Sequence, residues 1–264
     1  MDLSEKLKTK NFVPKILTFG SCLSRYTADR YSNMYGAWTV SSVYHNRSDQ
    51  FCEYFIDKKP EPDWGELTKS VLQEMTVNDK VGDEDPVQII RNQTVDTMGL
   101  HNIREGLPVG LVKSGVPLDV ILEQQDVDIV LMDNHMDLGA KLWYEKNGSK
   151  PFFMRSDYGP NFTDHYTLGP YLTADESAAY NNKIAAYLKT KLPRAKIIFL
   201  HFPISTKAQE RRINMTLEFV DALNSDLMNI VAPFYVKEPY NTTSSSHFKP
   251  ELYFSLAGCV RALL

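Results

Sequence analysis

Five short apolar runs, rich in β-branched and aromatic residues, recur along the chain and alternate with longer amphipathic stretches. Such runs are typical of buried strands, whereas apolar residues at i+3 and i+4 spacing favour helices. The strands are predicted at residues 16–19, 38–43, 126–132, 197–200 and 229–236, and the helices at 23–31, 117–122, 173–192, 206–223 and 247–264. This alternation predicts a three-layer α/β/α domain with a five-stranded parallel sheet.

Two stretches break the alternation. Residues 44–115 contain Pro60, Pro62 and the acidic run at 83–85, with one predicted helix at 64–75. No composition shift marks a linker, so this stretch is interpreted as an insertion in one domain spanning residues 1–264. The second stretch, residues 137–171, is rich in glycine, proline and aromatic residues. Its aromatic-rich part from Trp143 to Tyr171 is long enough to act as a flap over an active site, and we predict that role for it.

Composition narrows the class of protein. The chain has 264 residues, 43% of them hydrophobic and 23% charged, and a net charge of -4, which gives no basic footprint for nucleic acid. Its three cysteines show no CxxC spacing, and no histidine pattern suits a metal, so neither a disulfide framework nor a metal site is expected. The charged N-terminus and the lack of an apolar run of about 18 residues predict a cytoplasmic protein without a membrane span. The sequence does not indicate an oligomeric state.

Candidate chemistry begins at the end of the first strand, where Gly20 is followed by Ser21. In open α/β sheets, ligands bind in the crevice at the carboxyl ends of the strands, and the next helix would direct its first N–H groups there. His247 stands just before the last helix and is the kind of base that activates a serine nucleophile. The plain alternatives are a Gly-Ser turn and a histidine in a polar loop.

Other side chains near these junctions have two interpretations each. Cys22 is an alternative nucleophile at a helix N-terminus, or a small packed hydrophobe. Arg25 suits a substrate carboxylate or phosphate, or is a solvated helix residue. His135 and His201 follow the third and fourth strands, where they either line a polar substrate pocket or serve as core and turn histidines.

A serine after the first strand and a histidine before the last helix give an order that resembles the SGNH/GDSL hydrolase superfamily. Gly20-Ser21-Cys22 is similar to its GSCFA-like branch, in which GSC replaces GDS. The resemblance implies a flavodoxin-like sheet and acyl transfer. Ser21 would attack, His247 would relay the proton, and the Cys22 N–H with Asn134 would hold the oxyanion. Asn134 is otherwise a turn residue that bonds its own backbone.

Two elements of the family pattern are not matched. The family acid three residues before the histidine is replaced by Ser244, and Glu238 and Glu251 are the nearest carboxylates in sequence. Gly99 is a candidate for the family glycine. A dyad, an acid from elsewhere or an inactive site would each account for the missing acid.

The expected function is an esterase that removes O-acyl groups from a carbohydrate or similar small molecule, with no cofactor. One alternative is an intracellular O-acyltransferase of polysaccharide biosynthesis that uses acyl-CoA as donor. Another is a non-catalytic module that binds a sugar or a partner.

Overall fold

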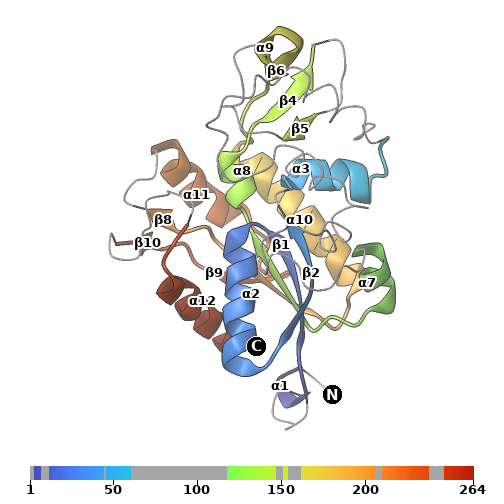
Figure 1. Cartoon of the computed structure of the whole chain (residues 1–264), viewed down its shortest axis with the longest axis vertical. Helices are drawn as coiled ribbons and strands as arrows, with labels where there is room; N and C mark the ends of the chain where they lie inside the picture. The colour runs from blue at the N-terminus through green and yellow to red at the C-terminus, as the bar shows by residue number, and fades with distance from the viewer. Residues whose placement is uncertain are drawn as a thin grey trace.

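The computed structural model describes residues 3–6, 12–44, 46–60, 118–146, 151–153, 162–205, 210–237 and 247–264. Its centre is a parallel sheet with the strand order β2-β1-β3-β7-β9 (Figure 1). The strands are β1 (Lys15–Gly20), β2 (Trp38–Tyr44), β3 (Ile129–Asp133), β7 (Lys196–Leu200) and β9 (Asn229–Val231). The predicted five-stranded parallel sheet is confirmed.

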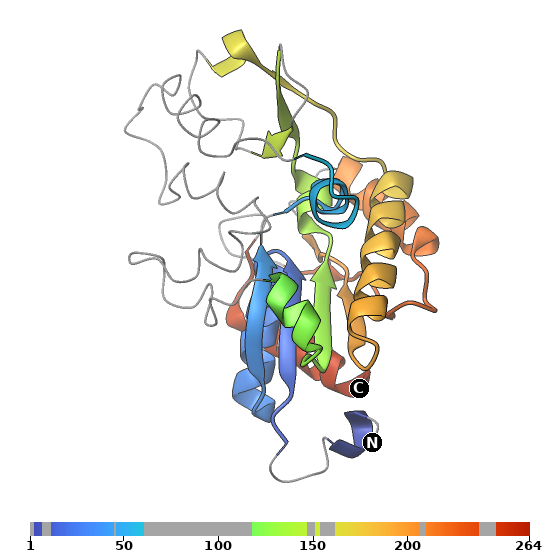
Figure 2. The same cartoon turned by 90° about the vertical axis from the view of Figure 1, so that its right-hand side faces the viewer.

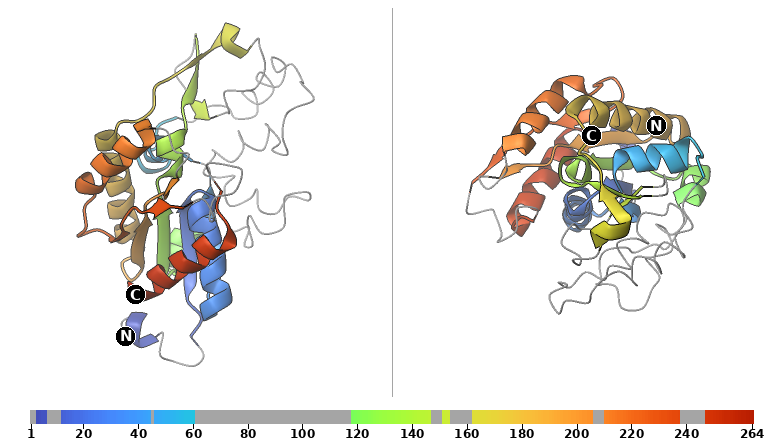
Figure 3. Two further views of the ribbon diagram at one scale, coloured as in Figure 1. Left: turned by 90° about the vertical axis from the view of Figure 1, so that its left-hand side faces the viewer. Right: turned by 90° about the horizontal axis from the view of Figure 1, so that it is seen from above.

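Helices cover both faces of the sheet (Figures 2 and 3). On one face α2 (Cys22–Tyr35) packs against α12 (Pro250–Ala262). The other face carries α7 (Leu118–Gln124), α10 (Ala174–Lys191) and α11 (Glu210–Ala222). The predicted capping box begins α10, since Thr173 and Glu176 bond each other's backbone N–H groups. The predicted α/β/α fold class is therefore confirmed.

The strand order creates a switch point between β1 and β3. From β1 the chain crosses to β2 on one side, and it later returns to β3 on the other side. Connections that leave neighbouring strands in opposite directions open a crevice at the carboxyl ends, where ligands of such sheets bind. Gly20 ends β1 there with φ +139°, and a Cβ at this position would lie 2.5 Å from Asp133 Oδ2. Only glycine suits this junction.

The region predicted as an insertion begins as part of the core. After β2, α3 (Ser48–Gln50) continues into the π-helix η1 (Phe51–Ile56). Phe51 is fully buried, and its ring meets Phe19 of β1 edge-to-face with 4.6 Å between centroids. Residues 61–117, with the predicted helix at 64–75, lie outside the described residues.

Two parts of the chain differ from the sequence prediction, the predicted flap and the fifth strand. The stretch predicted at 137–171 begins inside α8 (His135–Gly139) and contains α9 (Phe162–His165) and an antiparallel sheet of β4 (Leu142–Glu145), β5 (Phe152–Phe153) and β6 (Tyr166–Leu168). The predicted fifth strand at 229–236 is wrong in its extent. It divides at Pro233, which has no N–H for a ladder, and β10 (Tyr235–Val236) pairs instead with β8 (Ile204–Ser205).

Among the described residues, no helix is long and apolar enough to cross a bilayer.

Candidate active site

Asp133, the last residue of β3, joins the two loops at the switch point. Its Oδ2 accepts the N–H groups of Ser21 at 2.8 Å and Ser24 at 3.0 Å. Its Oδ1 accepts the Ser21 hydroxyl at 2.9 Å and the N–H of His135 at 3.0 Å. The carboxylate is buried, so these four donors supply the partners that a buried charge requires. Asp133 is not among the site residues predicted from the sequence, although its position directly after a predicted buried strand was a usable signal.

Ser21 is held by this carboxylate and by the start of α2. Its Oγ donates to Asp133 and accepts the N–H of Leu23 at 3.1 Å, which makes Ser21 the N-cap of α2. The side chain is 1% exposed. Among the described residues, no hydrogen bond joins Ser21 to His247, the pair that the sequence assigned as nucleophile and base. The Ser21 hydroxyl therefore has a structural task at this junction.

Cys22 is the side chain that meets His247. Its Sγ lies 3.4 Å from His247 Nε2, although the two residues are 225 positions apart. The packing of α12 against α2 brings them together, because Cys22 begins α2 and His247 precedes α12. Cys22 is half-buried, and as the first residue of a 14-residue helix it sits where the helix dipole favours a thiolate.

Two tyrosines pack beside this pair. Tyr26 follows Cys22 by one turn of α2, and its ring meets Tyr253 of α12 edge-to-face with 5.3 Å between centroids. Burial raises the pKa of Tyr26, and the charge of Cys22 and a hydrogen bond to Cys22 raise it further. Burial also raises the pKa of Tyr253 to about 12. Both phenols are therefore protonated at neutral pH, and Tyr26 acts as a donor to the sulfur of Cys22.

Tyr26→Phe is expected to slow the alkylation of Cys22 by iodoacetamide about threefold at pH 7. Loss of a hydrogen bond to the thiolate raises the thiol pKa by about one unit, while the more basic sulfur is intrinsically more nucleophilic and recovers part of the rate. The measurement is the pH dependence of the rate at the Cys22 peptide, with Tyr35→Phe at the exposed end of α2 as control. An unchanged pH profile contradicts this role.

The side-chain amide of Asn134 is held through its oxygen, while its nitrogen faces no acceptor in the described part of the chain. Its Oδ1 accepts the N–H of Phe202 at 3.0 Å, which fixes the orientation of the amide. Its Nδ2 is buried and has no acceptor among the described residues. Asn134 makes no capping bond to α8, so the interpretation as a self-bonding turn residue is wrong. A buried donor beside the switch point is what a developing oxyanion requires.

His135 and Phe202 continue this edge of the sheet. The half-buried His135 ring stacks on Phe202 with 4.2 Å between centroids, and Phe202 also meets Phe248, the neighbour of His247, at 5.4 Å. Phe202 therefore connects the loops after β3 and β7 to the segment that carries His247. Phe202 is not among the site residues predicted from the sequence.

Two predicted substrate-binding residues are fully buried. Arg25 has no exposed surface and pairs with Asp29 at 3.4 Å, so the alternative of a solvated helix residue is wrong. His201 is also fully buried, and its ring meets Phe199 and Phe219. Neither ring nitrogen of His201 has a hydrogen-bond partner among the described residues, and burial lowers its pKa to about 4.

His201→Phe is expected to reduce the acid sensitivity of the fold. An unfolded histidine titrates near 6.5, whereas His201 in the folded chain titrates near 4. Between these values the unfolded chain binds a proton that the folded chain does not, so stability falls as pH falls, by about 2 kcal/mol at pH 5. Urea unfolding at pH 7.5 and pH 5 measures the difference, with the exposed His165→Gln as control. Equal losses in wild type and His201→Phe contradict the assignment.

An acid behind His247 is not identified among the described residues. Glu251 is exposed in the first turn of α12 and makes no hydrogen bond to His247. Ser244 and Glu238 lie outside the described residues, as does Gly99. In the described part of the chain, no group of three or more His, Cys, Asp or Glu is arranged to hold a metal.

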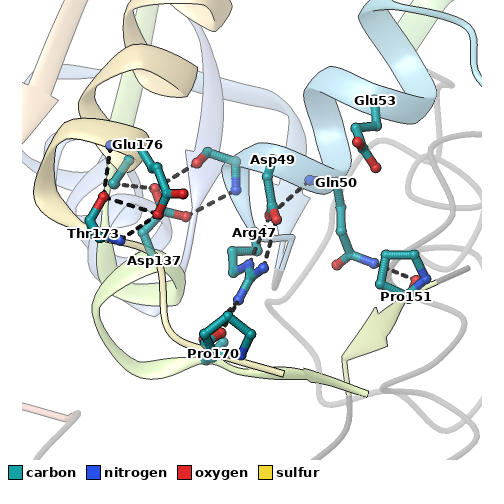
Figure 4. Close-up of polar contacts among 12 residues, drawn as sticks. Arg47, Asp49, Gln50, Glu53, Asp137, Pro151, Pro170, Thr173 and Glu176 are labelled. Atoms are coloured by element: carbon teal, nitrogen blue, oxygen red, sulfur yellow. Dashed lines mark hydrogen bonds and ion pairs between the residues drawn. The ribbon is translucent and has the colours of Figure 1, made fainter. Parts of the chain in front are cut away.

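A second polar cluster holds α8, the helix that follows Asn134 (Figure 4). Asp137 accepts hydrogen bonds from Ser48 Oγ at 2.7 Å, Ser177 Oγ at 2.5 Å and Asn181 Nδ2 at 2.8 Å. Burial raises the pKa of Asp137, while the bonds from Ser177 and Ser48 oppose this rise. Because the donors come from α3 and α10, the cluster fixes α8 between these helices and so positions Asn134.

Arg47 binds the segments next to this cluster. Its guanidinium forms two hydrogen bonds to Asp49, at 2.8 and 2.6 Å, and reaches the carbonyls of Ala140 and Pro170 at 3.3 Å each (Figure 4). These contacts join the loops on either side of the small antiparallel sheet. They give Arg47 a structural role.

No protein-family model matches the chain, and no curated protein matches it in sequence. Solved structures resemble it at low identity. An acetyl xylan esterase from the rumen bacterium Butyrivibrio proteoclasticus is 12% identical, with a TM-score of 0.44 over 97% of this chain and 64% of the esterase. A carbohydrate esterase family 2 enzyme with a carbohydrate-binding domain, from Corynascus thermopiles (Myceliophthora fergusii), is 11% identical, with a TM-score of 0.41 over 97% and 68%.

A third solved structure is that of a carbohydrate esterase whose active site has divergent catalytic and non-catalytic binding functions. It is 9% identical to this chain, with a TM-score of 0.40 over 95% of this chain and 69% of that one. The chain thus spans 64 to 69% of the length of these esterases. At these identities the activities of the esterases do not transfer to this chain.

Proposed function

We propose that this protein transfers acyl groups through Cys22, with His247 as the base. The distance of 3.4 Å between Cys22 Sγ and His247 Nε2, at the switch point of the sheet, carries this proposal. A thiol beside an imidazole at a helix N-terminus is the usual arrangement of an activated cysteine nucleophile. The proposal moves the nucleophile by one residue from Ser21, whose hydroxyl is engaged with Asp133.

The steps follow from the chemistry of the pair. His247 Nε2 takes the proton of Cys22, and the thiolate attacks the carbonyl carbon of an ester. The oxyanion that forms accepts a hydrogen bond from Asn134 Nδ2, the buried donor without a partner in the described chain. The C–O bond then breaks, the leaving alkoxide takes the proton from the imidazolium, and a thioester on Cys22 remains. Water activated by His247 releases the acid, which makes the protein an esterase.

The substrate class is an O-acyl ester, and acylated carbohydrates are the first compounds to test. The order of Gly20-Ser21-Cys22 and His247 in the sequence supports this choice through its SGNH/GDSL resemblance. If a sugar hydroxyl replaces water in the last step, the same residues perform O-acyl transfer from a donor such as acyl-CoA. Exclusion of water from the thioester distinguishes the two outcomes.

The test is to trap the acyl-enzyme. Wild-type protein is mixed with p-nitrophenyl acetate, quenched in acid and digested, and we expect one acetyl group on the peptide that contains Cys22. Cys22→Ala should lose the adduct, whereas Ser21→Ala should keep it. Cys52 is an internal control, because burial raises the pKa of its thiol to about 12, and exposed Cys259 reports nonspecific reaction. An acetyl group on Ser21, or none on either residue, contradicts the proposal, and the second result favours a binding module.

A further inference from the structure

Three cationic side chains gather between α8 and α11, helices that are in contact. The Arg211 guanidinium lies 3.6 Å from the centre of the Tyr171 ring, and the Lys141 ammonium lies 4.6 Å from the centre of the same ring. Arg212 follows Arg211 on α11 and lies against Gly139 of α8, where a Cβ would collide with its guanidinium. Three positive charges therefore surround Tyr171 and the C-terminal end of α8.

These charges lack a counter-ion within the described part of the chain. Neither arginine nor Lys141 forms an ion pair there, although other cations of the described chain do. Arg211 donates to the carbonyl of Leu138, and its Nε is buried with no acceptor among the residues that the structure describes. Burial lowers the pKa of Arg212, and the charge of Arg211 lowers it further. The chain has more acidic than basic residues, so a lack of carboxylates does not explain this arrangement.

A small pocket lies between Arg212, one of the three cations, and Phe202 at the edge of the candidate active site. Arg212, Phe202 and Pro203 are among its lining residues, and its volume is about 10 Å³, which is room for roughly one water-sized group. One oxygen of a carboxylate or phosphate is such a group. Phe202 lines this pocket and also contacts the candidate active site, because its N–H donates to Asn134 and its ring packs on His135.

We propose that Lys141, Arg211 and Arg212 form a subsite for an anionic oxygen group, a carboxylate or a phosphate, on the substrate. Guanidinium groups match both chemistries, since their N–H donors form paired, charge-assisted hydrogen bonds with two oxygens. Bound there, the anion offsets the repulsion among the three cations. The assignment of this anion to the substrate rests on the proposed function, whereas anion binding itself does not.

Binding is tested first, by calorimetric titration of the full chain with glucuronate, glucose and inorganic phosphate at low ionic strength. We expect at least one anion to bind, and glucose not to bind. Arg212→Gln and Lys141→Gln should each weaken the Kd of that anion about tenfold, the effect of one lost charge-assisted hydrogen bond. Arg194→Gln, an equal loss of charge at an exposed turn before β7, should bind like wild type. Binding of phosphate alone or glucuronate alone identifies the anion.

The subsite is overturned if neither anion binds to wild type, or if both variants bind the anion as tightly as wild type does. Two variants are used so that misfolding of one leaves the test intact.

Kinetics then connect the subsite to the reaction. With acetyl esters of glucuronate and glucose, or with the phosphate counterpart, Arg212→Gln should raise KM about tenfold for the anionic ester and leave the neutral ester unchanged. If wild type turns over neither ester while Arg212-dependent anion binding persists, the proposed function fails and the anion subsite stands. If esters are turned over and KM for the anionic ester is the same in Arg212→Gln and wild type, the substrate subsite is refuted.

Discussion

His247→Gln is expected to slow the acetylation of Cys22 by p-nitrophenyl acetate at pH 7 by about a hundredfold or more. A positioned general base contributes rate factors of about 10² to 10⁴, and glutamine cannot take the proton of the thiol. The helix N-terminus and the Tyr26 donor still favour a thiolate, so some reaction remains. Stopped-flow release of p-nitrophenol measures the rate, and the position of the acetyl group is confirmed on the Cys22 peptide.

The pH dependence separates a lost base from a damaged fold. Because hydroxide replaces His247 as the pH rises, the rate of His247→Gln should approach that of wild type in alkaline solution. His165→Gln, an exposed histidine on α9, is the matched control and should react like wild type. A His247→Gln protein that is acetylated at the wild-type rate at pH 7 removes His247 from the mechanism.

Asp133→Asn is expected to lower the free energy of unfolding by about 3 kcal/mol. The carboxylate accepts two hydrogen bonds on each oxygen, from Ser21, Ser24 and His135. Asparagine replaces one of these oxygens with an NH₂ group, so two donors lose their acceptor and face another donor. Urea unfolding followed by circular dichroism measures the loss.

Asp126→Asn is the control for a lost charge, because Asp126 forms an exposed ion pair with Lys15. Such pairs contribute about 1 kcal/mol or less, so this variant should remain close to wild type. A loss below about 1 kcal/mol in Asp133→Asn would show that the β1 and β3 loops hold together without the carboxylate. Acetylation of Cys22 in folded Asp133→Asn reports whether the loops still present the thiol to His247.

The elements of the sheet were determined locally. The apolar runs predicted all the strands of the five-stranded sheet, and the Thr173–Glu176 capping box gave the start of α10. A turn at Gly20-Ser21 was one of the interpretations of the sequence, because the position of Gly20 after an apolar run is visible there. The antiparallel strands within residues 137–171 were missed, because their pairing depends on contacts between segments that are each only a few residues long.

The tertiary structure alone decided the roles at the site. Ser21 and Cys22 are neighbours in sequence, but successive residues at a helix start point in different directions, so one meets Asp133 and the other meets His247. The burial of a helix residue is likewise decided by the tertiary structure. Whether Arg25 faces water or the core depends on which face of α2 is covered. The sequence by itself thus determined the five strands of the central sheet, the main helices that cover it and the edge of the sheet at which the chemistry gathers. The packing of α2 on α12 determined that Cys22 meets His247, because contacts over 225 positions leave no local pattern in the chain.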